Sequence, residues 1–325
     1  MTPLLEVEDL RITFPTRHGT SHPVDGVSFS VARGELLALV GESGCGKSLT
    51  SLALLRLVPP PGQIQHGSTI RLDGTDVLAL GPEELRSIRG RRIGMIFQDP
   101  MTSLNPVFTV ADQIGESVRA HQKVSKRAAR ARALELLQEV GIPDPEKRLD
   151  VYPHQMSGGM RQRVMIAIAL ASEPEMLIAD EPTTALDVTV QAQILELLDG
   201  LRAARGMAVL LITHDLGIVA GRADRVAVMY AGRLVEEATT AELFARPSHP
   251  YTKGLLASVP RITGPVTRLT PIAGTVPAPT AWPAGCRFHP RCPAAMPRCA
   301  SDDPPALRVG EAHRMRCWLA EGSQA

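Results

Sequence analysis

The sequence has no excess of charge of either sign, no long apolar run and, over most of its length, almost no cysteine. Its 325 residues contain 35 Lys and Arg against 34 Asp and Glu without a polybasic block, which argues against an electrostatic nucleic-acid binder. The longest apolar run, Val164 to Ala171, is far below the roughly 18 residues that a membrane-spanning helix needs. We therefore expect a soluble chain that does not cross a membrane.

The N-terminus also lacks the pattern of a secretory signal. Glu6, Glu8 and Asp9 stand where a signal peptide would place a basic region and a long apolar stretch. We therefore expect the protein to be cytoplasmic.

Cysteine and proline are unevenly distributed along the chain. Cys45 is alone in the first 285 residues, and 13 of the 27 prolines fall from residue 239 onward. This break in composition predicts a domain of residues 1–238 and a C-terminal extension of residues 239–325. In a reducing compartment, clustered cysteines suggest metal binding before disulfides. The four cysteines of the extension are Cys286, Cys292, Cys299 and Cys317.

The N-terminal third predicts two kinds of strand. Leu5 to Phe14 and Val27 to Val31 alternate apolar and polar residues, which is typical of antiparallel strands. Leu36 to Val40 is a continuous apolar run that stops at a glycine-rich turn, as in a strand buried on both faces of a parallel sheet. A helix is expected from about Ser48 to Leu57.

The middle of the chain predicts a strand, helix, strand crossover preceded by a helical insertion. Met176 to Ala179 and Val209 to Ile212 read as buried strands, and Val190 to Arg205 as the helix between them. Val110 to Val140 has Ala, Leu, Glu and Arg at helical spacing. A short hairpin within residues 226–236 is expected to close the domain.

The glycine-rich turn has the Walker A spacing and lies between a buried strand and a helix, as that loop requires. Its backbone N–H groups and the helix N-terminus can surround phosphates. We expect Lys47 to reach the β and γ phosphates of ATP, and the Ser48 hydroxyl to bind Mg²⁺. The expected ATP contacts in this segment are Gly41, Glu42, Ser43, Gly44, Cys45, Gly46, Lys47, Ser48 and Leu49.

Two carboxylates end the buried strand that begins at Met176. Asp180 is expected to hold the Mg²⁺ shell, and Glu181 to polarise the attacking water. A strand that ends in Asp-Glu is weak evidence alone, but the pairing with the upstream loop makes it strong.

The most specific feature lies shortly before this strand, and through it the first 240 residues resemble the ABC ATPase family. It is the loop and helix Met156-Ser157-Gly158-Gly159-Met160-Arg161-Gln162-Arg163. Ser157 and the amides of Gly158 and Gly159 form a second anion site. In the family this site faces the γ-phosphate bound by another protomer. Met156 and Met160 stand where the common form has Leu and Gln.

Other elements that the resemblance implies follow in order. Gln98 matches the Q-loop glutamine, which contacts the metal and couples the nucleotide to a membrane partner. Thr184 to Asp187 matches the D-loop, and His214 the switch histidine that organises attacking water with the glutamate. Phe14 matches the aromatic residue that stacks on adenine, and Val24 is expected to close the other side of the base.

The tail resembles one branch of the family, the ATPases of dipeptide and oligopeptide importers, with nickel importers as close relatives. The likeness lies in the amino-acid sequences of three segments, which are Pro247 to Leu256, Glu42-Ser43 and Gln98 to Pro106. It implies a second homologous nucleotide-binding subunit or a homodimer, two permease subunits and an extracytoplasmic substrate-binding protein, with the chain at the cytoplasmic face of the membrane. No nucleic-acid partner is expected.

The predicted fold is α/β: a RecA-like P-loop core of residues 1 to about 98 and 171 to 238, with an antiparallel β subdomain. A helical subdomain of about 99–170 and a small extension complete it. The first rival function is a soluble ABC ATPase that acts on DNA or ribosomes, but the chain has one signature loop and no heptad run. The second rival function is that of a small-molecule kinase, which would not account for the signature loop or for His214.

The four cysteines of the extension predict one metal centre, for which we favour a [4Fe-4S] cluster. Gaps of five, six and seventeen residues contain no Cys-x₂-Cys pair of the kind usual in structural zinc sites. Arg287, Arg291 and Arg298 lie between the cysteines and could offset the charge of a cluster. The low apolar content of the tail predicts little core of its own, so that metal would contribute to its folding. Zinc, free thiols and a disulfide pair stay open as alternatives.

Overall fold

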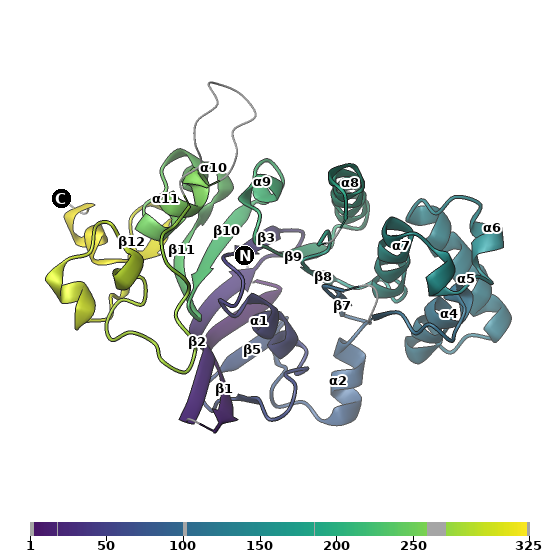
Figure 1. The fold of residues 1–325 in the computed structure, drawn as a ribbon. Helices are drawn as coiled ribbons and strands as arrows, with labels where there is room; N and C mark the ends of the chain where they lie inside the picture. Colours follow the sequence, from purple (N-terminus) through teal and green to yellow (C-terminus); the bar gives the residue numbers. More distant parts are fainter. Residues whose placement is uncertain (1–2, 18, 100–102, 185, 259–270, 324–325) are drawn as a thin grey trace. The chain divides into compact units, whose positions relative to one another are not determined.

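The computed structural model describes residues 3–17, 19–99, 103–184, 186–258 and 271–323. They fall into two compact units, residues 1–78 with 212–325 and residues 79–211. Each unit combines strands and helices (Figure 1). These units are not the domains expected from the sequence, so the domain limits at residues 238 and 239 stay a prediction. Within the described ranges, no helix combines the length and apolar character needed to cross a bilayer.

The first unit contains an antiparallel sheet built from the N-terminal segment. Its strand order is β2-β1-β5-β6, and β4 also pairs with β1. Val7 lies opposite Phe29 and Leu5 opposite Val31, so the alternating apolar side chains share one buried face. The strands are β1 (Leu5–Thr16), β2 (Gly19–Val31), β4 (Gln63–Ile64), β5 (Thr69–Leu72) and β6 (Thr75–Asp76).

The same unit holds a second run of strands in the order β12-β13-β11-β10-β3. Strand β3 (Leu36–Val40) is buried throughout and pairs in parallel with β10 (Arg225–Tyr230). The tight turn at Ala231-Gly232, where both φ angles are positive, joins β10 to β11 (Arg233–Thr239). The helices of this unit are α1 (Lys47–Leu54), α9 (Leu216–Val219), α10 (Thr240–Ala245) and α11 (Pro250–Ala257).

The second unit contains the helical insertion and the strands that flank it. Its strands are ordered β9-β8-β7, and β7 pairs with β8 in parallel. The predicted helical region is two helices, each with a side-chain cap, Thr109 or Ser125. The strands are β7 (Ile93–Ile96), β8 (Met176–Asp180) and β9 (Ala208–Thr213). The helices are α2 (Pro82–Ile88), α4 (Val110–His121), α5 (Lys126–Glu139), α6 (Pro145–Arg148), α7 (Gly158–Ala169) and α8 (Val188–Arg205).

The C-terminal extension is part of the first unit and continues one of its sheets. Strands β12 (Ala306–Arg308) and β13 (Arg314–Arg316) continue the sheet, because β13 pairs with β11. Met315, Cys317 and Ala320 form a small buried cluster beneath them. This small cluster consists of tail residues, and strand pairing joins the tail to β11. The expectation that the tail has little core of its own stays a prediction. Figure 1 shows its strands beside β11.

Buried polar contacts fasten the extension at a second place. The Glu236 carboxylate on β11 has a fully buried side chain and accepts hydrogen bonds from the backbone N–H groups of Ser248 (2.7 Å) and His249 (2.9 Å). It also lies 2.7 Å from His313 Nε2. One carboxylate thus satisfies groups from two segments of the extension, as a buried charge requires.

Candidate functional site

The loop between β3 and α1 has a backbone suited to phosphate binding. Gly44 and Gly46 have φ angles of +79° and +106°, where a side chain would be strained. A Cβ atom at Gly46 would also lie 2.4 Å from the carbonyl oxygen of Pro23, so that only glycine fits. Gly46 precedes α1, whose first-turn N–H groups have no intrahelical acceptor. These donors are the ones that an anion would engage.

Lys47 is the first residue of α1, and its side chain folds back onto the loop. It is 4% exposed, and Nζ donates hydrogen bonds to the carbonyl oxygens of Gly41 (2.8 Å) and Glu42 (3.1 Å). The ammonium group is therefore held beside the loop backbone. Cys45 is fully buried, and burial raises the pKa of its thiol. Ser48 and Leu49 follow Lys47 on α1.

The predicted adenine contacts lie on β1 and β2. Val24 is fully buried, and its Cγ2 is 3.3 Å from where a Cβ of Gly46 would be, so it packs beside the phosphate loop. Phe14 is half-buried, and its ring lies directly against Gly62. His214 follows β9 and is exposed. Adenine stacking on Phe14 stays a prediction.

In the second unit, hydrogen bonds join Glu181 to two other predicted residues, Gln98 of the Q-loop and Thr184 of the D-loop. Asp180, 4% exposed, ends β8, and Glu181 follows it in the left-handed region with φ +45°. Gln98 Nε2 donates to Glu181 Oε2 at 3.2 Å, and Thr184 Oγ1 donates to the same oxygen at 2.9 Å. Residues other than glycine rarely adopt a positive φ. Those that do are often found at active sites and ligand-binding sites.

The signature loop begins α7 in this second unit. Ser157 caps the helix by accepting a hydrogen bond from the Met160 N–H at 3.3 Å, and Ser157 and Gly158 are both exposed. A Cβ at Gly159 would lie 2.7 Å from Val190 Cγ1, which explains the glycine there. Asp187 caps α8 by accepting from the Val190 N–H at 2.9 Å. Ala185 of the D-loop lies outside the described residues, as do Pro100, Met101 and Thr102 after Gln98.

The predicted ATP residues are divided between the two units. The phosphate loop, Phe14, Val24 and His214 belong to the first, and the other expected residues to the second. Those of the second unit are Gln98, the signature loop, Asp180, Glu181 and Asp187.

The thiols of the four cysteines of the extension influence one another's pKa. Burial, together with the thiols of Cys317 and Cys299, raises the pKa of Cys286. Burial, together with Cys286 and Cys299, raises the pKa of Cys292. Burial, together with Cys292 and Cys299, raises the pKa of Cys317. Among the residues that the structure describes, however, no three His, Cys, Asp or Glu side chains are arranged to hold a metal ion.

The arginines between these cysteines have carboxylate partners of their own. Arg287 pairs with Asp25 on β2, Arg291 with Glu42 and Arg298 with Glu321. Each guanidinium therefore faces a carboxylate in this structure, and their role in offsetting a cluster's charge stays a prediction. The Arg291–Glu42 pair joins the extension to the phosphate loop across 249 residues, and no sequence pattern indicated it.

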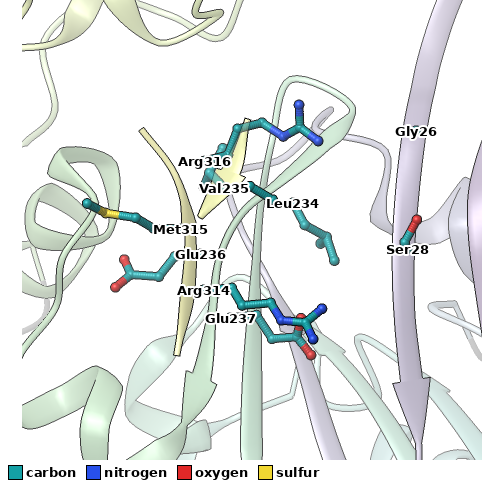
Figure 2. A pocket seen from close by; sticks show the side chains of 10 residues that line it. Gly26, Ser28, Leu234, Val235, Glu236, Glu237, Arg314, Met315 and Arg316 are labelled. Atoms are coloured by element: carbon teal, nitrogen blue, oxygen red, sulfur yellow. The ribbon is translucent and has the colours of Figure 1, made fainter. Parts of the chain in front are cut away.

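A cavity of about 160 Å³ lies where the extension joins the sheet (Figure 2). It is lined by Gly26 and Ser28 of β2, by residues 234–237 of β11 and by residues 314–316 of β13. Figure 2 shows Arg314 and Glu237 side by side, in agreement with their pairing across the strands. The residues predicted to bind ATP, Mg²⁺ or a cluster do not line this cavity.

The buried strands, the phosphate loop and the signature loop are those of an ABC ATPase, and comparison with known proteins agrees. Residues 24–184 match the ABC transporter family, and residues 235–299 match the C-terminal region of oligopeptide/dipeptide transporters. A dimeric ATP-binding cassette solved with ADP and Pi has a TM-score of 0.65 and 27% identity, over 73% of this chain and 98% of that one.

Curated relatives define the family more narrowly. The dipeptide transport ATP-binding protein DppD of Bacillus subtilis is 52% identical over 99% of this chain and 96% of its own length. The oligopeptide transport ATP-binding protein OppD of the same organism is 53% identical over 98% of this chain and 89% of its length. The chain belongs to the family of dipeptide and oligopeptide transport ATP-binding proteins, and it is an ATPase.

Proposed function

We propose that this subunit hydrolyses ATP to energise the import of dipeptides or oligopeptides through separate permease subunits. The observation that carries the proposal is similarity over nearly the full length, C-terminal extension included, to proteins named for the transport of these substrates. The substrate itself would be selected by an extracytoplasmic binding protein and by the permeases.

We assign the ATP chemistry to residues of both units. The loop from Gly41 to Leu49 binds the phosphates, with Lys47 at the β and γ positions and Phe14 and Val24 at the base. Ser48, Asp180 and Gln98 hold Mg²⁺, which when bound neutralises charge on the transferring phosphoryl group. Support for Glu181 as the base comes from its hydrogen bonds to Gln98 and Thr184, which fix the carboxylate that would polarise the water. His214 would contact the γ-phosphate.

The active unit in this proposal is a pair of nucleotide-binding subunits. The chain has one phosphate loop and one signature loop. Ser157 and Gly158 are exposed, which suits a site for the γ-phosphate held by a partner. The partner is a homologous subunit or a second copy of this chain, and the dimeric state of the matched cassette supports a pair. Closing and opening of the pair would move the two permeases.

The location follows from these partners. We place the subunit at the cytoplasmic face of the cell membrane, bound peripherally through the permeases. The test is affinity purification of the tagged chain from solubilised membranes. Two membrane subunits should co-purify, whereas recovery with ribosomes or DNA instead would favour the rival function.

We also propose that Cys286, Cys292, Cys299 and Cys317 hold a [4Fe-4S] cluster, with zinc as the alternative. The influence of the thiols on one another's pKa supports this proposal, because a cluster takes four thiolates, each bound to a different iron. Bound metal would stabilise the extension rather than take part in catalysis. Anaerobic purification followed by iron, sulfide and zinc analysis tests this. Four irons and four sulfides per chain are expected, and stoichiometric zinc without iron, or no metal, would overturn the cluster.

A further inference from the structure

The C-terminal extension places a buried arginine on the phosphate loop. Arg291 donates to both carboxylate oxygens of Glu42, from Nη1 at 2.8 Å and from Nη2 at 3.0 Å. The arginine side chain is 4% exposed and that of Glu42 is 31% exposed. A two-point pair of this kind fixes the orientation as well as the distance of the carboxylate. Glu42 is the second residue of the predicted phosphate loop.

Contacts from the extension and from β10 also fix Arg291 itself. Its Nε donates to the carbonyl oxygen of Ala273 at 2.8 Å, and its guanidinium lies 5.7 Å from the centre of the Tyr230 ring. Nη1 lies 3.4 Å from the Tyr230 hydroxyl. The hydrogen bond to Glu42 raises the pKa of Arg291 further, so the side chain stays charged. The position of this charge is therefore set before any ligand arrives.

A second residue of this region fixes the Glu42 backbone. The Glu42 N–H donates to the Tyr251 hydroxyl at 2.9 Å, and Tyr251 on α11 is fully buried. Its ring packs against those of Tyr230 (4.6 Å between centres) and Phe288 (5.4 Å). The Glu42 carbonyl in turn accepts from Lys47 Nζ. The N–H, the carbonyl and the carboxylate of one loop residue are thus all engaged.

The charge of Glu42 makes this arrangement consequential for nucleotide binding. A carboxylate on a loop that receives a triphosphate repels it, and the repulsion is strong where water is excluded. Arg291 neutralises this carboxylate from the side of the extension. We propose that Arg291 is a positioning residue of the ATP site: it offsets the charge of Glu42 and, with Tyr251, holds the start of the phosphate loop. The C-terminal extension therefore contributes to ATP affinity.

The inference rests on the proposed role of this loop in phosphate binding, and equilibrium ATP binding to the full-length subunit with Mg²⁺ tests both. Arg291→Ala should weaken binding by roughly tenfold, because it leaves an uncompensated carboxylate on the loop that is proposed to bind the phosphates. Arg291→Ala combined with Glu42→Gln should recover most of that loss. Arg298→Ala is the matched control, since it removes an arginine–glutamate pair of the same extension that does not involve the loop. It should leave affinity unchanged.

The outcomes separate the inference from the proposed function. Normal binding by Arg291→Ala, or a double variant as weak as the single one, would overturn the role of Arg291. Lys47→Ala should abolish tight binding in any case, and if it binds normally, the loop is not the phosphate site at all. If Arg291→Ala does not fold, Glu42→Gln alone decides: it should bind ATP more tightly than the wild type, because it removes a negative charge from the loop and leaves that of Arg291, and unchanged or weaker binding would contradict the charge argument.

Discussion

Glu181 combines an unusual backbone with two fixed hydrogen bonds. Its φ of +45° is uncommon for a residue with a side chain, and Gln98 and Thr184 both donate to one carboxylate oxygen. Its position after a buried strand was predictable from the sequence, whereas its backbone angle was not. The angle depends on the turn that Glu181 shares with Thr184, whose N–H donates to the Glu181 carbonyl at 3.1 Å.

Glu181→Gln should keep ATP binding but slow hydrolysis by roughly 10²- to 10⁴-fold. The amide oxygen still accepts from Gln98 and Thr184, but it no longer takes a proton from water. Single-turnover ATP hydrolysis by the assembled complex measures the effect. Near-normal turnover would refute the assignment of the base, and Glu146→Gln, on exposed α6, is the control expected to have no effect.

Helix α11 is capped at its N-terminus by a histidine that the fold keeps neutral. His249 is 1% exposed, its Nδ1 accepts from the Tyr251 N–H at 3.0 Å, and burial lowers its pKa to about 3. The unfolded chain has an ordinary histidine, with a pKa of about 6.5. The folded form is therefore fully stable above this pH, and stability is lost as the pH falls toward 3, because only the unfolded chain takes up the proton.

His249→Asn should reduce this loss of stability in acid. Asparagine keeps an acceptor for the Tyr251 N–H but does not titrate. The melting temperature of the variant should be lower than that of the wild type at neutral pH, yet fall less steeply between about pH 6.5 and pH 4. Thermal unfolding of both proteins across this range is the measurement. Parallel curves would show that His249 is not the group responsible.

Strand β11 depends on the buried carboxylate of Glu236. Glu236→Ala would leave two backbone N–H groups and His313 without their acceptor, at a cost of about 3–5 kcal/mol of unfolding free energy. Glu8→Ala is the control, because its pair with Arg71 is exposed on both sides and contributes about 0–1 kcal/mol. Melting temperatures compare them, and equal shifts would contradict the structural role of Glu236.

The sequence predicted the strands that carry an unbroken apolar run. Strands β3 and β8 lie where expected, because five successive buried residues in each follow one simple pattern. The strands of the extension could not be found in this way. β13 is Arg-Met-Arg with one buried side chain, and it becomes a strand only because β11 offers an edge to pair with. Such tertiary pairing leaves no periodic signal in three residues.

Contacts between residues far apart in the chain could not be predicted from the sequence either. Each motif of the ATP site was recognisable because its residues are neighbours in the sequence. The contact between Arg291 and Glu42 joins residues far apart, and Arg291 had been associated with the cysteines beside it. The extension, expected to be an appendage poor in core, belongs to the same compact unit as the phosphate loop. The spacing of residues in the sequence therefore could not predict the influence of the extension on ATP binding, which depends on the folded structure.

At the scale of the whole complex, we propose that ATP hydrolysis by this subunit powers peptide import. The most direct test is the ATPase rate of the complete complex in liposomes, measured with the binding protein empty and then loaded with a mixture of short peptides. Loaded binding protein should stimulate hydrolysis, with peptide uptake rising in step, and Glu181→Gln in this subunit should depress both. Hydrolysis that does not respond to loaded binding protein, with no peptide uptake, would contradict the claim.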